Sequence, residues 1–165
     1  MQVILTKIDE MELTPEIKQQ LEAQKENCIF CKIISGEMQS HKVYEDEELI
    51  GILDINPATD GHILLVPKEH YPILPFMPEQ TFKYVFGKIP NLAKALKKAM
   101  VRTGCNVFIA NGAVAGQQSQ HFLLHLIPRE EGDNINFVLD EEKAIDTENQ
   151  QKIIFALAKN MSLMM

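Results

Sequence analysis

The chain has 165 residues, 45% hydrophobic and 24% charged, proportions typical of a globular protein that buries one core without disulfides. Its 23 acidic and 16 basic residues give a formal net charge of −7, which disfavours nucleic-acid binding through bulk charge. No apolar run approaches the roughly 18–20 residues of a membrane span, and the start lacks a basic region, so we expect a cytoplasmic protein.

The first 27 residues are predicted to be an N-terminal extension that contains one short helix. Thr14, Pro15 and Glu16 match an N-cap, a proline at the first helical position and an acid in the first turn. Apolar residues four apart follow them, and the helix is expected to end near Asn27.

Five strands are predicted in the middle of the chain, at residues 42–45, 49–55, 62–66, 106–110 and 120–127. A short acidic turn joins the first two, which predicts a hairpin rather than strands that alternate with helices. The pattern therefore predicts an antiparallel sheet of the α+β class.

One long helix is predicted at residues 78–100, where apolar residues three and four apart form one face. Pro90 is expected to kink it, because proline removes one backbone hydrogen bond. Residues 130–150 are acidic and weakly patterned, and apolar spacing from Ile153 onward predicts a C-terminal helix. We expect three parts, at residues 1–27, 28–129 and 130–165.

Two histidines, His121 and His125, lie on the last predicted strand, just after a glycine-containing turn. Alternation along the strand places Leu123 on their face. It places the intervening apolar residues in the core: Phe122, Leu124 and Leu126. Two such histidines alone are more often half-buried side chains bonded to backbone carbonyls than a site. Further residues of the kinds used by metal and phosphate sites favour a site here: Cys28, Cys31, His62, His70 and Asn111.

Cys28 and Cys31 form a Cys-x-x-Cys motif, which in a reducing cytoplasm indicates metal or redox chemistry more than a structural bridge. A pair of buried free thiols is the structural alternative. A thioredoxin-like redox role is less favoured, because the strand–helix setting of such motifs is missing.

From Asn27 to Arg129 the chain resembles the histidine triad (HIT) family. The matching segments share order and spacing over this whole stretch: Cys28–Ile34, Val43–Asp46, Leu53–Ile55, Gly61–His70, Asn111–Gly112, Gly116–Gln117 and His121–Arg129. The resemblance implies a five-stranded antiparallel sheet with a long helix on one face. It also implies a homodimer with a continuous ten-stranded sheet, and binding of a purine nucleoside monophosphate.

The family pattern places three histidines at alternate positions, and Leu123 stands here at the middle one. In the family that histidine attacks the α-phosphorus and forms a covalent nucleotidyl-histidine. Leucine has no lone pair, so the resemblance implies a lost or severely impaired hydrolase or transferase activity. No catalytic residue is assigned, and His62 and His125 are expected in supporting positions. Gln118 stands where the family commonly has a serine that donates to the phosphate.

The resemblance also implies two sets of binding residues. A structural zinc ion would be held by Cys28, Cys31, His70 and His121, a closed Cys₂His₂ set. The base would lie against Phe30, Ile33, Ile52 and Ile55, which could equally be core residues, and Asp54 would accept from the ribose unless it only caps a turn. The phosphate would be surrounded by Asn111, Gly116, Gln117, Gln118 and His125.

Three functions remain open from the sequence. The favoured one is a nucleotide-binding protein without standard HIT chemistry. The alternatives are a nucleotide phosphate hydrolase with a shifted mechanism, and a zinc-stabilised dimeric interaction module with a vestigial pocket. Residues 28–129 carry a net charge of only +1, so the acidity lies in the two extensions, which are candidates for contact with a protein partner.

Overall fold

The computed structural model describes residues 14–136 and 147–161. Among the described residues, 14–134 form one compact unit, and helix α4 (Thr147–Met161) belongs to a second unit. The predicted C-terminal helix is therefore present, while residues 137–146 of the predicted acidic segment lie outside the described residues. In the described part of the chain, no helix is both long and apolar enough to cross a membrane.

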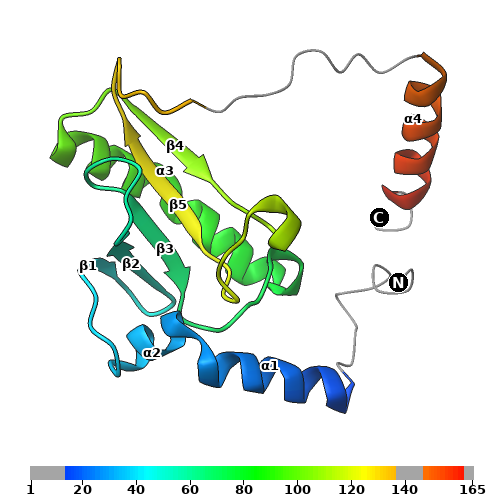
Figure 1. Cartoon of the computed structure of the whole chain (residues 1–165), viewed down its shortest axis with the longest axis horizontal. Helices are drawn as coiled ribbons and strands as arrows, with labels where there is room; N and C mark the ends of the chain where they lie inside the picture. The colour runs from blue at the N-terminus through cyan, green and yellow to red at the C-terminus, as the bar shows by residue number, and fades with distance from the viewer. Residues whose placement is uncertain (1–13, 137–146, 162–165) are drawn as a thin grey trace. The chain divides into compact units, whose positions relative to one another are not determined.

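The larger unit is built on a five-stranded antiparallel sheet with the order β1-β2-β3-β5-β4 (Figure 1). The strands are β1 (Lys42–Glu45), β2 (Leu49–Leu53), β3 (Ile63–Pro67), β4 (Gly104–Phe108) and β5 (Leu124–Arg129). Two 3₁₀ turns, η1 (Leu74–Phe76) and η2 (Ala113–Ala115), lie in the connections. The predicted α+β class, the number of strands and the first hairpin are confirmed.

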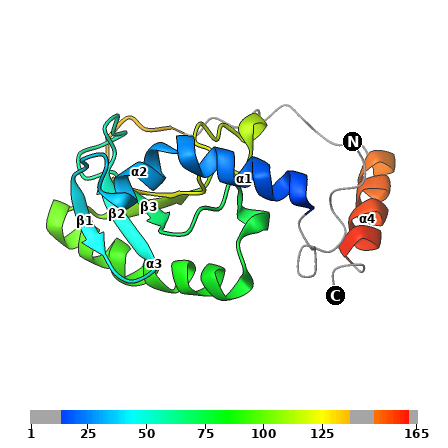
Figure 2. The same ribbon diagram turned by 90° about the horizontal axis from the view of Figure 1, so that it is seen from below.

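Helices cover both faces of the sheet. The long helix α3 (Glu79–Met100) packs on one face, and the short helix α2 (Ile29–Ser35) lies on the other (Figure 2). The α3 side contains the larger core: Leu49, Leu65, Met77, Val85, Leu96, Phe122, Leu124 and Leu126. The α2 side contains a smaller one: Ile33, Ile50, Ile52, Leu64 and Val66. Two apolar faces explain why β2 and β3 are apolar at nearly every position.

The last strand starts later than predicted and continues through Pro128. Residues 121–123 lie outside the strand, and the Phe122 N–H donates to the Tyr71 carbonyl instead of to a ladder. Strand β5 pairs with β3 only through its residues 124–126, so Pro128 has a pairing partner on β4 alone. The N–H that proline lacks therefore removes no hydrogen bond between β5 and β3. The burial of Phe122, Leu124 and Leu126 is confirmed.

Helix α1 (Pro15–Asn27) forms as its caps predict. The Thr14 hydroxyl accepts from the Ile17 N–H at 3.4 Å, and Pro15 stands at the first helical position. None of its residues is buried. Cys28 separates α1 from α2 in an extended conformation, and Gly36 ends α2 with a φ of 85°, which glycine adopts without strain.

One carboxylate fastens α3 to the β1–β2 hairpin. Asp46 Oδ2 accepts from the Tyr84 hydroxyl at 2.8 Å and from the Tyr44 hydroxyl, and Lys88 Nζ lies 3.3 Å away. Asp46 Oδ1 accepts from the Leu49 N–H at 2.8 Å. Burial raises the pKa of Asp46, but the hydrogen bonds outweigh it and hold that pKa well below its usual range.

Asp46→Asn is expected to lower the free energy of unfolding at pH 7 by about 2–3 kcal/mol, because it removes a charged acceptor with several donors. The folded-state pKa of Asp46 is depressed, so its contribution is complete above the unfolded pKa of about 3.9 and is lost at lower pH. Urea unfolding at a series of pH values should show the difference from wild type shrink as pH falls below about 4. Exposed Glu47, changed to Gln, is the matched control, and an equal loss there would contradict the assignment.

Candidate functional site

Two cysteines and two histidines meet on the α2 side of the sheet. Cys28 precedes α2 and Cys31 lies in its first turn, while His70 follows β3 and His121 precedes β5. One ligand atom from each lies within 4.8 Å of all the others. Cys28 is 5% exposed, His70 8% and His121 0%. Residues more than 90 positions apart in the chain thus form one compact cluster.

The distances in this cluster suit a tetrahedral metal ion. Cys28 Sγ lies 3.5 Å from His121 Nδ1, Cys31 Sγ lies 3.6 Å from the same nitrogen, and Cys31 Sγ lies 3.3 Å from His70 Nδ1. A tetrahedron with zinc–sulfur bonds of about 2.3 Å and zinc–nitrogen bonds of about 2.0–2.1 Å has sulfur–nitrogen edges of about 3.5 Å. The donor set therefore fits zinc.

Hydrogen bonding also prepares His121 as a ligand. Its Nε2 donates to the Pro67 carbonyl at 2.9 Å, which leaves the Nδ1 lone pair directed at the two sulfurs. Burial, reinforced by His70, lowers the pKa of His121 to about 4, and burial lowers that of His70. Burial and the adjacent Cys28 raise the pKa of Cys31 to about 12. A bound cation would compensate the charge of thiolates in this setting.

A pocket of about 480 Å³ opens beside the cluster on the same side of the sheet. Its walls come from α2, the segment after β2, the ends of β3 and β4, the loop after η2 and the start of β5. The lining residues are Ile29, Phe30, Asp54, Ile55, Asn56, His62, Leu64, Phe108, Ala110, Gly116, Gln117, Gln118, Ser119, Leu123 and His125. Asp54 is the one charged residue among them, and neither Lys nor Arg lines this pocket.

Asp54, His62 and His125 form a chain of polar contacts along one wall of the pocket. His62 Nε2 lies 2.9 Å from His125 Nδ1, and Asp54 Oδ2 lies 3.4 Å from His62 Nδ1. The Ala58 N–H donates to His62 Nδ1 at 3.2 Å, so this nitrogen is an acceptor and makes no hydrogen bond with Asp54 Oδ2. The proton of neutral His62 is thereby assigned to Nε2, and that of neutral His125 to its Nε2. Burial lowers the pKa of both histidines, so the pair is neutral at pH 7.

Seven of the ten residues expected at a nucleotide line this pocket: Phe30, Asp54, Ile55, Gly116, Gln117, Gln118 and His125. Ile33 and Ile52 belong instead to the core under α2. The Asn111 side chain does not line the pocket, and its oxygen accepts from the Leu74 N–H at 2.9 Å.

Gln117 holds the loop at residues 112–119 in shape through its amide group. Its Oε1 accepts from the Gly112 N–H at 2.8 Å, and its Nε2 donates to the carbonyls of Pro72 and Ser119 at 2.6 and 2.7 Å. Gly116 adopts a φ of 87°, a conformation that favours glycine. Gln117 is thus committed to backbone groups, whereas for Gln118 no such bond is found in the described part of the chain.

Six residues that line the pocket are not predicted from the sequence: Ile29, Asn56, Leu64, Phe108, Ala110 and Ser119. Phe108 is the most informative of them. It pairs with His125 across β4 and β5, and the two rings lie 5.7 Å apart. Leu64 could have been found by alternation, because it lies two residues after His62.

The comparisons with known proteins agree with this fold. The family model described as "HIT domain" matches residues 35–132. The Uncharacterized HIT-like protein MJ0866 of Methanocaldococcus jannaschii is 42% identical over 77% of this chain and 98% of its own length. An adenosine 5′-monophosphoramidase of Candida albicans is 36% identical over 66% of this chain and 74% of its own length.

Solved structures show the same likeness. The crystal structure of SMU.412c from Streptococcus mutans has a TM-score of 0.76 and 36% identity, covering 82% of this chain and 85% of that one. A Zn-bound histidine triad family protein from Mycobacterium smegmatis has a TM-score of 0.65 and 34% identity, and the match covers 84% of this chain and 98% of that one. With the sheet, the flanking helices and the family match in agreement, the chain belongs to the HIT family.

Proposed function

We propose that this protein binds a purine nucleoside monophosphate without standard nucleotidyl-histidine chemistry. One observation carries the proposal: Leu123 lines the pocket beside His125, at the middle of the alternating positions 121, 123 and 125. An aliphatic side chain offers no lone pair to phosphorus at that place. The relative named as a phosphoramidase and the family match support nucleotide phosphate as the ligand class.

The lining suggests how such a ligand would be held. Phe30, Ile55 and Phe108 provide apolar surface for a base, and the Asp54 carboxylate can accept from ribose hydroxyls. The phosphate would lie by the loop at residues 116–119 and the Nε2–H of His125. Ile33 and Ile52 would then support this wall from the core, and Asn111 would anchor its loop.

Calorimetry with AMP and 2′-deoxy-AMP tests the ribose contact. Wild type is expected to bind AMP about 10–100-fold more tightly, because a hydrogen bond to a charged group contributes about 1.5–3 kcal/mol. Asp54→Asn should remove most of that difference while its amide oxygen still accepts from the Asn56 N–H, which lies 2.8 Å from Asp54 Oδ1. The absence of heat with both AMP and GMP would mean a vestigial pocket and would contradict the proposal.

We further propose that Cys28, Cys31, His70 and His121 hold a structural zinc ion. The sulfur–nitrogen distances and the Zn-bound relative support this. All four positions would be filled by protein, leaving no open site for a water or substrate. Zinc would act as a redox-inert crosslink between α2 and the segments next to β3 and β5.

We also propose a homodimer that extends the sheet through β4. The edges of the sheet are β1 and β4. Strand β1 begins with Lys42, ends with Glu45 and pairs irregularly with β2, features that discourage further pairing. Strand β4 has no charged residue, and Val107 and Phe108 are 46% and 39% exposed.

Val107→Lys is therefore expected to convert a dimer to monomer, because a lysine on an edge strand opposes pairing with another chain. Val43→Lys on β1, where the valine is 51% exposed, is the matched control and should leave the assembly unchanged. Sedimentation velocity distinguishes the two states. A monomeric wild type, or a dimer disrupted only by Val43→Lys, would contradict the β4 interface.

A further inference from the structure

We propose that Cys28 and Cys31 form a peroxide-sensitive dithiol, and that its oxidation to a disulfide releases helix α1 from the domain. The two sulfurs belong to the cluster whose ligand atoms lie within 4.8 Å of one another. Cysteines three apart around the first turn of a helix have Cα atoms about 5–6 Å apart, within the range that a disulfide spans. This inference goes beyond nucleotide binding and rests in part on the zinc site proposed above.

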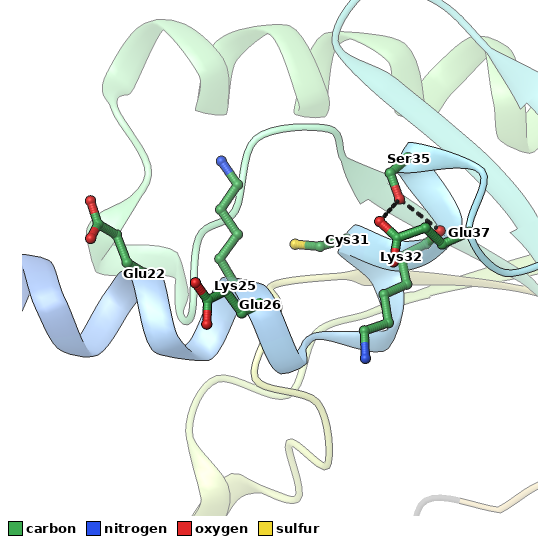
Figure 3. Close-up of a pocket in the computed structure, with 7 residues that line it drawn as sticks. All are labelled: Glu22, Lys25, Glu26, Cys31, Lys32, Ser35 and Glu37. Carbon is green, nitrogen blue, oxygen red and sulfur yellow. Dashed lines mark hydrogen bonds between the residues drawn. The ribbon is translucent and has the colours of Figure 1, made fainter.

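The two thiols differ in access. Cys28 is 5% exposed, whereas Cys31 lines a second pocket of about 410 Å³ between α1 and α2. Figure 3 shows the Cys31 sulfur directed into this space, toward Lys25. The remaining lining residues are Glu22, Glu26, Lys32, Ser35 and Glu37. A small oxidant can therefore reach Cys31 from solvent, with Cys28 buried behind it to resolve the oxidised sulfur.

A hydroperoxide is the oxidant that converts the two thiols to a disulfide. The Cys31 sulfur gives up its thiol proton to solvent and attacks the peroxide, the O–O bond breaks, and a sulfenic acid forms on Cys31. The Cys28 thiolate then forms the S–S bond and expels hydroxide. Two electrons pass from the sulfurs to hydrogen peroxide, and solvent protons complete two molecules of water. A zinc ion would keep both sulfurs as thiolates beforehand and would leave unreduced when they are lost as ligands.

Few contacts hold helix α1 against the rest of its unit. It has no buried residue, and its direct ion pair to the sheet side joins Lys25 and Glu69 at 3.4 Å, with both side chains more than half exposed. Such a pair contributes little stability. The buried residue at its C-terminal end is Cys28, which contacts His121, and the Gln24 side-chain oxygen is a buried atom. A helix of 13 residues is marginal in water without tertiary contacts, so its release should expose it to proteolysis.

The test treats the full-length chain, first analysed for zinc content, with stoichiometric hydrogen peroxide. Peptide mass mapping is expected to show a Cys28–Cys31 disulfide, and tryptic cleavage after Lys18 and Lys25 in α1 should accelerate on the order of tenfold. Dithiothreitol should reverse both changes, and zinc, where present, should appear in a colorimetric chelator assay. Cys105→Ser should respond as wild type does, and Cys31→Ser should form no disulfide.

Each of three results would overturn the proposal. They are three free thiols after treatment, sulfinic acid on Cys31 without a disulfide, and a disulfide without faster cleavage in α1. A chain produced in zinc-supplemented medium that contains no zinc, yet forms the disulfide and releases α1, would support the dithiol proposal while contradicting the zinc site. The failure of one proposal is thus distinguishable from the failure of the other.

Discussion

Leu123→His is expected to produce adenosine phosphoramidase activity at least about 10³-fold above that of wild type. Loss of a nucleophile that acts as part of a unit costs about 10⁴–10⁶ in turnover, and the substitution restores an imidazole next to His125 in the pocket. Leu123 is only partly buried, so the new side chain does not have to enter the core. Ammonia release from adenosine 5′-phosphoramidate and mass spectrometry of the adenylylated protein measure the gain.

Leu123→Asn is the matched control, since its amide is polar but has no nucleophilic lone pair on nitrogen. It should stay inactive while AMP binding is retained. A wild type that is already as active as Leu123→His would show that this chain catalyses the reaction without a histidine at position 123. Inactivity of Leu123→His would point to Gln118, and adding Gln118→Ser to the variant would then test the phosphate donor.

Removal of the metal is the second large effect that we expect. Extraction by a strong chelator, or Cys31→Ser, should lower the free energy of unfolding by more than about 4 kcal/mol, because the binding energy of a structural zinc ion is folding energy. The cluster links α2 to segments beside β3 and β5 that are far apart in sequence, so its loss should affect the whole domain. Elemental analysis combined with urea unfolding measures metal content and stability on the same sample.

Cys105→Ser provides the control for the metal experiment. Cys105 is a partly buried thiol on β4 that packs against the α3-side core and does not belong to the cluster. Its replacement should leave the metal content at wild-type level. A chain produced in zinc-supplemented medium that contains no zinc, yet unfolds at the same urea concentration with and without chelator, would contradict the structural metal.

Local signals predicted most of the helices and strands. The N-cap at Thr14 and the proline after it set the start of α1. The end of β2 is earlier than predicted, at Leu53, because Asp54 turns the chain and accepts from the Asn56 N–H. The start of β5 was wrong for a different reason: whether residues 121–123 join a ladder depends on how β3 and β4 align with them.

Which residues line the pocket also depends on contacts between segments that are distant in sequence. Ile33 and Ile52 look no different in sequence from Ile55, yet the first two are buried in the core and Ile55 is 84% exposed at the pocket. Phe108 reaches the pocket because it pairs with His125, and a register between strands is not encoded at either strand alone. Residue type does not distinguish these three isoleucines, whereas their solvent exposure in the structure does.

The sequence by itself determined the fold class, the alternation that buries Phe122, Leu124 and Leu126, and the presence of leucine where two neighbouring positions on one face carry histidine. Each of these follows from residue type and short-range spacing. Only the tertiary structure brought Cys28 and Cys31 to within 3.6 Å of imidazole nitrogens and aligned Asp54, His62 and His125. The reason is physical: such distances depend on strand register and helix packing, which are set by the whole core rather than by any one segment.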